Sequence, residues 1–182
     1  MAERLLLVGM MGAGKTTTAR LAAERLGWGW VDTDAEVSRA VGVSVADLFA
    51  RHGEARFRRE ESRALADVLE RDEPVVVSVG GGAVLDERNR DMLRAAGTVV
   101  WLRARPETLI ERVIDDVGRP LLVGATPQDR AETLRRIDAD RRTLYAEVAD
   151  DILDVDHLDA DQVAERLLQR AGGGVPDRQA RA

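Results

Sequence analysis

The chain has 182 residues, of which 45% are hydrophobic and 33% charged, and its net charge is −6. This composition predicts one globular domain, and no apolar run approaches the roughly 20 residues of a membrane span. The acidic balance argues against nucleic acid as the main partner, and the lack of cysteine excludes disulfides and thiolate metal sites. Because Met1 to Arg4 lead straight into an apolar run, we expect no signal peptide and a cytoplasmic protein.

Apolar runs of strand length alternate with stretches of helical spacing along the chain. The predicted strands are residues 5–8, 28–31, 75–79, 98–102 and 152–155. The predicted helices are residues 17–26, about 35–39, 45–71, 87–95, 107–115, 128–148 and 160–170. This alternation predicts an α/β fold with a five-stranded parallel sheet, whose ligands bind at the carboxyl ends of the strands.

Two segments depart from the alternation. Residues 117–127 are bounded by glycine and proline and are long enough to form a mobile lid. Residues 171–182 (AGGGVPDRQARA) have the composition of a disordered tail. We therefore expect a single domain over residues 1–170.

A glycine-rich loop follows the first predicted strand. Residues 9–16 read Gly-Met-Met-Gly-Ala-Gly-Lys-Thr and match the phosphate-binding P-loop pattern G-x-x-x-x-G-K-[ST]. The order of strand, loop and helix directs backbone N–H groups at an anion, with Lys15 on the β/γ oxygens and the Thr16 hydroxyl on Mg²⁺. Lys15 is the only lysine, while the other 26 basic residues are arginines, which indicates that a compact ammonium is needed there. An ordinary glycine turn would not explain why the loop pattern, the flanking strand and helix, and the single lysine occur together.

Acidic residues follow the second predicted strand, as Asp32-Thr33-Asp34. One interpretation is that they cap the next helix. The other is that one carboxylate orders the waters of Mg²⁺ while the second faces an acceptor hydroxyl. A GTP switch would need a second lysine to read guanine, and a motor ATPase would end its central strand in an acid rather than in glycines. The pattern is therefore typical of small-molecule and nucleotide kinases.

Three consecutive glycines, Gly80 to Gly82, follow the buried strand at residues 75–79. They are either a loose turn or a place where the backbone closely approaches a ligand, and we favour the second. Most of the arginines are expected to be solvated.

Taken in order, these motifs resemble the shikimate kinases over about residues 4–170. The matching segments are the P-loop, Asp32-Thr33-Asp34, Phe57-Arg58-Arg59-Glu60-Glu61, Gly80-Gly81-Gly82, Arg119-Pro120-Leu121-Leu122 and Arg141-Arg142-Thr143-Leu144-Tyr145. The resemblance implies a three-layer P-loop NTPase fold of the nucleoside monophosphate kinase type, with a mobile lid. It also implies ATP-dependent phosphorylation of the 3-hydroxyl of shikimate, a step in chorismate and aromatic amino-acid biosynthesis, by an enzyme that we expect to be a monomer.

The resemblance further implies which residues bind each ligand. The nucleotide would be bound by Gly12, Ala13, Gly14, Lys15, Thr16, Thr17, Arg112 and Arg119. Shikimate would be bound by Asp34, Arg58, Gly80, Gly81, Gly82 and Arg141, partly from a helical region at about residues 33–61. Mg²⁺ would be held by Thr16 and, through water, by Asp32.

Individual roles follow from the same resemblance. Asp34 would orient or deprotonate the attacking hydroxyl, and Arg58 and Arg141 would hold the carboxylate. Catalysis would involve Lys15 and Arg119 in addition to Asp34, with Arg119 reaching the transferring phosphoryl group from the lid and Arg112 lying against adenine. Phe49 and Phe57 match apolar positions near the acceptor, although a core role explains them equally well.

Two departures and two alternatives remain. Residues 156–160 on the adenine side are acidic and carry no distinctive signature, and Thr143 stands where many relatives have proline. One alternative is another kinase of this fold, such as a gluconate kinase or a nucleoside monophosphate kinase. A gluconate kinase would not be expected to combine the Asp-Thr-Asp, triple-glycine and Arg-Pro-Leu-Leu features. The other is a catalytically silent P-loop protein, which loss of Lys15, Asp34 or Arg119 would favour, and all three are present.

Overall fold

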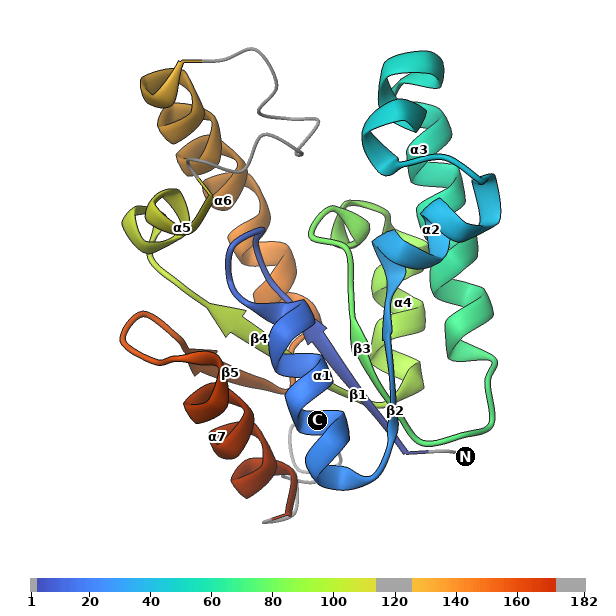
Figure 1. The fold of residues 1–182 in the computed structure, drawn as a ribbon, viewed down its shortest axis with the longest axis vertical. Coiled ribbons are helices and arrows are strands. Elements are labelled where there is room, and N and C mark those ends of the chain that lie inside the picture. Colours follow the sequence, from blue (N-terminus) through green and yellow to red (C-terminus); the bar gives the residue numbers. More distant parts are fainter. Residues whose placement is uncertain (1–2, 114–125, 173–182) are drawn as a thin grey trace.

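The computed structural model describes residues 3–113 and 126–172 (Figure 1). Five parallel strands form one sheet in the order β2-β3-β1-β4-β5. The strands are β1 (Arg4–Val8), β2 (Gly29–Asp32), β3 (Val75–Ser78), β4 (Thr98–Arg103) and β5 (Asp151–Asp154). The helices are α1 (Lys15–Leu26), α2 (Thr33–Val41), α3 (Val45–Leu69), the short 3₁₀ helix η1 (Ala83–Leu85), α4 (Glu87–Ala96), α5 (Pro106–Val113), α6 (Pro127–Val148) and α7 (Ala160–Gly172). The predicted α/β fold with a five-stranded parallel sheet is confirmed.

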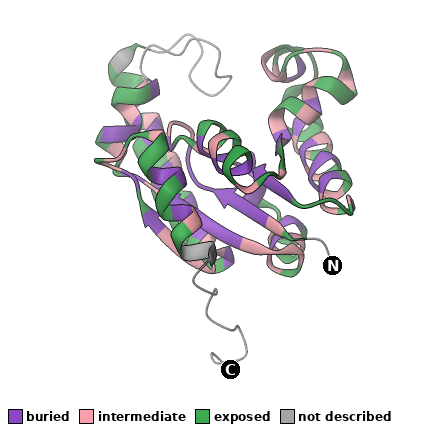
Figure 2. Cartoon of the chain, turned by 60° about the horizontal axis from the view of Figure 1, so that its bottom comes forward, coloured by how far each residue is buried: buried purple, intermediate pink, exposed green. Residues whose placement is uncertain are grey.

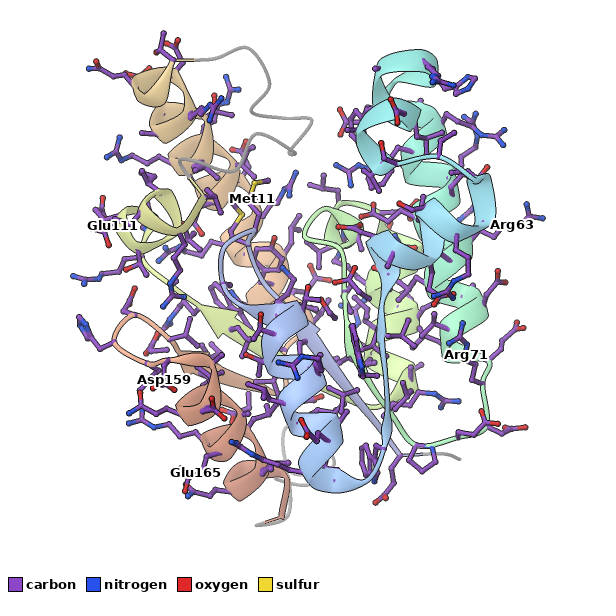
Figure 3. All side chains as sticks on the ribbon, viewed as in Figure 1. Met11, Arg63, Arg71, Glu111, Asp159 and Glu165 are labelled. Atoms are coloured by element: carbon purple, nitrogen blue, oxygen red, sulfur yellow. The ribbon has the colours of Figure 1, made fainter. Side chains whose placement is uncertain are left out.

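The sheet is the middle of three layers. Helices α1 and α7 pack on one face, while α4 and α6 pack on the other with α3 beside α4 (Figure 1). Leu6 and Leu7 of the central strand β1 are 0% exposed, because both faces of a parallel sheet are covered by helices. Buried residues gather in the strands and on the inward sides of the helices (Figure 2). Charged side chains such as Arg63 and Glu165 project outward (Figure 3).

The carboxyl ends of the first three strands lie together. Strands β2 and β3 pair in a register that sets Asp32 beside Ser78, and β1 pairs with β3 so that Leu7 lies beside Ser78. Because the strands are parallel, the P-loop after β1, the acidic segment after β2 and the glycines after β3 all leave the sheet at the same edge. The prediction that these three segments lie at one edge of the sheet is confirmed.

Helix α3 is not the uninterrupted helix predicted over residues 45–71. Gly53 has φ 75° and ψ 172°, a conformation that breaks the helix and that glycine adopts easily because it has no Cβ. The apolar spacing continues on both sides of Gly53, so the pattern did not show the break. Helices α2 and α3 share a small apolar cluster of their own, formed by Val37, Leu48, Phe57 and Ala64.

The ends of two predicted elements fall outside the described residues. Helix α5 is described to Val113, whereas the prediction extended it to residue 115, and most of the predicted lid lies in the undescribed range 114–125. Helix α7 continues to Gly172, two residues beyond its predicted end, and residues 173–182 are not described. In the described parts of the chain, no helix has both the length and the apolar composition required to cross a membrane.

Candidate active site

The P-loop is a tightly enclosed turn between β1 and α1. Gly9, Gly12 and Gly14 have φ values of 138°, 82° and 87°, which side chains other than glycine rarely adopt. A Cβ added at Gly9 would lie 2.5 Å from the Leu102 carbonyl oxygen, and one at Gly12 would lie 2.8 Å from Val113 Cγ1. The glycines therefore allow both the turn itself and its contact with the neighbouring elements.

The amino terminus of α1 faces the space enclosed by this loop. Its N-cap residue is Gly14, and no side chain caps its first N–H groups, so these remain available to an anion. The Lys15 ammonium donates to the carbonyl oxygens of Gly9 at 2.8 Å and Met10 at 3.0 Å. The positive charge is thus held over the loop before any phosphate arrives.

Asp32 uses its two carboxylate oxygens differently. Oδ1 accepts the backbone N–H groups of Asp34 at 3.0 Å and Ala35 at 3.3 Å, which makes Asp32 the N-cap of α2. Oδ2 accepts the hydroxyls of Thr16 at 2.5 Å and Ser78 at 2.9 Å. These three oxygen-bearing side chains suit Mg²⁺, which takes few protein ligands and keeps several waters and phosphate oxygens.

Asp34 is the second residue of α2 and lies close to a second carboxylate, that of Glu61. A Cβ added at Gly80 would lie 2.6 Å from Glu61 Oε1 and 2.8 Å from Asp34 Oδ1, so the glycine backbone runs against both. Burial raises the pKa of Glu61, the Arg58 guanidinium opposes this, and the charge of Asp34 raises the pKa further. Since Asp32 is the N-cap of α2, the Asp34 carboxylate is not needed to cap the helix. Its charge lies near that of Glu61 instead.

Arg58 is held by two glutamates on its own helix. Its Nη1 donates to Glu61 Oε2 at 2.7 Å, and its Nη2 donates to Glu54 Oε1 at 2.9 Å. Burial opposes the charge, but Glu61 and Glu54 together raise the pKa of Arg58 above its ordinary value, so the guanidinium stays charged. The Glu61 side chain is 2% exposed and that of Glu54 is 54% exposed. Glu54 is therefore the partner that can give way to a ligand.

Arg141 and Tyr145 reach the glycine loop from α6. The Gly81 carbonyl accepts the Arg141 Nη1–H at 3.0 Å and the Tyr145 hydroxyl at 2.6 Å. Gly82 lies on the other side of the loop, where an added Cβ would overlap the Arg58 guanidinium. A side chain at any of the three glycines would therefore press on a different group: the Asp34 and Glu61 carboxylates, the Gly9 carbonyl oxygen or the Arg58 guanidinium.

Arg112 connects the P-loop with the segment after β5. Its Nη1 donates to the Gly12 carbonyl at 3.4 Å, and its Nη2 donates to the Val155 carbonyl at 3.1 Å. Asp156 joins the same region to the start of α5, because its Oδ1 accepts the Arg105 backbone N–H and the Thr108 hydroxyl, each at 2.8 Å. This corner is built mainly from backbone carbonyls and carries no side-chain signature for a particular base.

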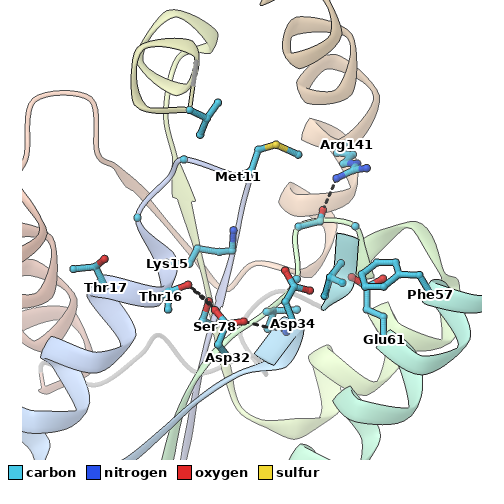
Figure 4. Close-up of a pocket in the computed structure, with 18 of the residues that line it drawn as sticks. Met11, Lys15, Thr16, Thr17, Asp32, Asp34, Phe57, Glu61, Ser78 and Arg141 are labelled. Atoms are coloured by element: carbon cyan, nitrogen blue, oxygen red, sulfur yellow. Dashed lines mark hydrogen bonds between the residues drawn. The ribbon is translucent and has the colours of Figure 1, made fainter. Parts of the chain in front are cut away.

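One cavity of about 470 Å³ brings nearly all the predicted site residues together (Figure 4). Its nucleotide side is lined by Gly12, Gly14, Lys15, Thr16, Thr17, Asp32 and Arg112. Its acceptor side is lined by Asp34, Arg58, Gly80, Gly81, Gly82 and Arg141. Ala13 is 1% exposed and is not among the lining residues, so it can reach a ligand only through its backbone. Arg119 lies outside the described residues.

Phe49 and Phe57 fit both interpretations given to them. They line the cavity, and their rings pack against each other with centroids 4.8 Å apart in the small cluster of α2 and α3. They are therefore core residues whose exposed edges form the apolar wall of the site.

Sequence reasoning assigned no role to Glu61, Ser78 or Tyr145. Glu61 could have been found from its position three residues after Arg58 on a helix, where side chains meet. Ser78 could have been found as the one polar residue of the predicted strand at residues 75–79, whose carboxyl end was expected near the P-loop. Tyr145 lies one helical turn after Arg141, but that spacing does not indicate its contact, which is to a backbone atom 64 residues away.

Comparison with known proteins supplies the family. A family model described as shikimate kinase matches residues 11–171. The shikimate kinase of Xanthomonas axonopodis pv. citri (strain 306) is 43% identical over 93% of this chain and 92% of its own. That of Moorella thermoacetica is 43% identical over 93% and 94%. The chain belongs to the shikimate kinase family.

A solved structure supports this membership of the shikimate kinase family. The shikimate kinase of Acinetobacter baumannii in complex with shikimate has a TM-score of 0.89 and 34% identity, covering 95% of this chain and 94% of that one. The predicted nucleoside monophosphate kinase-like P-loop fold is therefore confirmed, as is the resemblance from which it came.

Proposed function

We propose that this chain transfers the γ-phosphoryl group of ATP to the 3-hydroxyl of shikimate, giving shikimate 3-phosphate and ADP. The reaction is a step in chorismate and aromatic amino-acid biosynthesis. The observation that carries the proposal is a cavity lined on one side by a P-loop and on the other by two arginines and the carboxylates of Asp34 and Glu61. The family of the chain supplies the identity of the acceptor.

The acceptor side has the chemistry that an anionic polyol requires. A carboxylate is held best by planar guanidinium groups, which donate two parallel hydrogen bonds. We assign this role to Arg58 and Arg141, with Glu54 yielding its place on Arg58. Asp34 then faces the hydroxyl that attacks and orients or deprotonates it, while Gly80 to Gly82 lie against the ring.

The donor side neutralises charge rather than forming covalent bonds. Phosphoryl transfer depends mainly on positioning and on neutralising the charge of the phosphate oxygens. The P-loop N–H groups with Thr17, together with Lys15, bind the phosphates, and Arg112 lies beside the base. Thr16 and Asp32, the latter aligned by Ser78, are suited to Mg²⁺, which when bound would neutralise the β and γ oxygens.

The assay that tests the function compares acceptors on the purified protein. ATP consumption with Mg²⁺ should be rapid with shikimate and near background with gluconate or AMP. Turnover of gluconate or AMP but not shikimate would assign the chain to another acceptor class. ATP binding without turnover of any acceptor would indicate a silent P-loop protein.

The carboxylate assignment predicts a specific kinetic change. Arg58→Lys and Arg141→Lys should each raise KM for shikimate with little change in KM for ATP, because a lysine cannot donate the paired hydrogen bonds. The loss should be about 1.5–3 kcal/mol for a charge-assisted hydrogen bond. Arg59→Lys and Arg142→Lys are matched controls, because these neighbours are exposed and do not line the cavity. Unchanged shikimate KM in both test variants would place the carboxylate elsewhere.

The metal assignment is tested through Ser78, which touches Asp32 without capping α2. Ser78→Ala should raise the Mg²⁺ concentration required for half-maximal activity, by about 10–100-fold if the hydroxyl aligns the carboxylate as residues around metal ligands commonly do. The readout is kcat as a function of Mg²⁺ at saturating substrates, with Ser62→Ala on α3 as the control. An unchanged Mg²⁺ dependence would show that Ser78 does not act on the metal site.

The lid remains a proposal from the sequence. We propose that residues 117–127 form a lid carrying Arg119 within a single kinase domain over residues 1–170. Hydrogen exchange in this segment should slow when an unreactive ATP analogue and shikimate bind together, and equal exchange with and without them would refute a closing lid. Arg119→Ala should lower kcat far more than it weakens ATP binding.

Three broader assignments complete the proposal. We propose that the enzyme is cytoplasmic, that it acts as a monomer and that the chain ends in a disordered tail, predicted over residues 171–182. The first two residues of that range belong to α7, and the others lie outside the described residues. The cavity is lined by residues of one chain, which supports the monomer.

A further inference from the structure

The Gly81 carbonyl receives two hydrogen bonds from one face of α6. Arg141 Nη1 lies 3.0 Å from it and the Tyr145 hydroxyl 2.6 Å. The two side chains are four residues apart, so they lie one helical turn from each other. Both are buried, with Tyr145 0% and Arg141 6% exposed. Because a carbonyl oxygen has two lone pairs, the two donors together fill its hydrogen-bonding capacity.

The two donors differ in what else they can do. Arg141 lines the cavity and carries a charged guanidinium with five N–H donors. Tyr145 is not among the cavity-lining residues, and its ring packs against Trp101 with centroids 5.7 Å apart. Burial raises the pKa of Tyr145 to about 12, against the opposing effect of Arg141, so its hydroxyl is a neutral donor at physiological pH. Arg141 can therefore turn toward a ligand, whereas Tyr145 stays on Gly81.

We propose that Tyr145 is a positioning residue that releases Arg141 to the substrate. When Arg141 turns to the substrate carboxylate, the Tyr145 hydroxyl keeps the Gly81 carbonyl hydrogen-bonded. This inference rests on the proposed function, in which Arg141 binds the carboxylate of shikimate. Without the hydroxyl, Arg141 would leave a carbonyl with no donor from α6, so it would remain on Gly81 and bind the substrate less well.

The same hydrogen bond also fixes the glycine loop against the P-loop. A Cβ added at Gly81 would lie 3.6 Å from the Tyr145 hydroxyl and 3.2 Å from the Gly9 carbonyl oxygen, so Gly81 lies between α6 and the nucleotide side. The peptide that joins Gly81 to Gly82 is planar and trans, so fixing the carbonyl also fixes the direction of the Gly82 N–H. Tyr145 thereby keeps the loop in one arrangement whether Arg141 is on Gly81 or on the substrate.

A double-mutant cycle tests the proposal. Tyr145→Phe removes only the hydroxyl and keeps the ring against Trp101. It should raise KM for shikimate by about 3–10-fold, the range expected for one lost hydrogen bond, and leave KM for ATP unchanged. In an Arg141→Ala background the same substitution should add less than about twofold, because no guanidinium remains to be released. An equal rise in both backgrounds, or an unchanged KM in the single variant, would overturn the proposal.

A second measurement needs no substitution at position 145. Tyr145 is the only tyrosine of the chain, so biosynthetic labelling with 3-fluorotyrosine places fluorine at this position alone. Its single ¹⁹F resonance should shift when shikimate saturates the labelled wild-type protein, and should not shift when shikimate saturates labelled Arg141→Ala. No shift in the wild type, or the same shift in both proteins, would reject the inference. Failure of the proposed function would look different, as absent turnover of shikimate or an unchanged shikimate KM in Arg141→Ala.

Discussion

Replacing Lys15 with arginine should lower kcat by at least about 100-fold, the usual cost of losing one preorganised donor to a charged transition state, although the positive charge is kept. The Lys15 ammonium lies 2.8 Å and 3.0 Å from two P-loop carbonyl oxygens. Widening the loop to admit a planar guanidinium would be costly, because there is no room for even a Cβ between Gly9 and the Leu102 carbonyl oxygen or between Gly12 and Val113. The charge would therefore be displaced from the phosphates.

Arg63→Lys, on the surface, is a matched control for Lys15→Arg. Arg63 is exposed on α3, and Arg63→Lys exchanges the same two residue types in the reverse direction away from the cavity. The control should retain wild-type kcat, and both variants should melt near the wild-type temperature. An active Lys15→Arg enzyme would show that charge alone suffices, and the retention of one lysine in the chain would then need another explanation.

Asp34→Asn should lower kcat by about 10²–10⁴-fold or more while ATP binding is retained, because asparagine cannot accept the hydroxyl proton. Its stability should be equal to or higher than that of the wild type. Asp32, not Asp34, caps α2, and the charge of Asp34 raises the pKa of the nearby Glu61, so its removal relieves a repulsion between two acids. Activity and stability should thus change in opposite directions, as often happens at catalytic sites.

The measurement is kcat together with melting temperature on the same preparation. Asp86→Ala is the control, because Asp86 caps α4 outside the cavity. It should cost about 0.5–2 kcal/mol of stability and leave kcat intact, the reverse of the Asp34→Asn result. Comparing Asp34→Asn with Asp34→Ala separates two roles, since substantial activity in the asparagine variant alone would indicate orientation of the hydroxyl rather than proton removal. A stable and fully active Asp34→Asn would end the catalytic assignment.

The fold was largely predictable because its signals are local. Most strands are short apolar runs, and the loops after the first three strands begin with residues of distinct chemistry, so their order in the sequence indicated the sheet and its ligand-binding edge. The break in α3 at Gly53 was not predictable, because a glycine inside a periodic stretch looks the same whether it continues the helix or interrupts it. The strand order followed from no local pattern, since it depends on which strands pair.

Candidate site residues could be predicted where the surrounding sequence forms a recognisable motif. They could not be predicted where the residue contacts a group that only folding brings near. Lys15 and the glycines after β3 carry their chemistry in the sequence around them. Glu61 and Tyr145 act instead on groups brought near by folding, namely Arg58 with Asp34 and the backbone of Gly81. The roles of Asp32 and Asp34 could be separated only by geometry, because both residue types and positions suit a helix cap.

The double use of Asp32 has a consequence for inhibitor resistance. Its Oδ1 holds the first turn of α2, which carries Asp34, and its Oδ2 faces the P-loop threonine. A substitution that weakened the binding of a drug at this carboxylate would also disturb the start of α2 or remove the negative charge beside the phosphates. Asparagine preserves the cap but not the charge, and glutamate preserves the charge but is one methylene longer. A substitution that removes the contact of a compound with Asp32 would therefore also disturb either the start of α2 or the contact with the P-loop threonine.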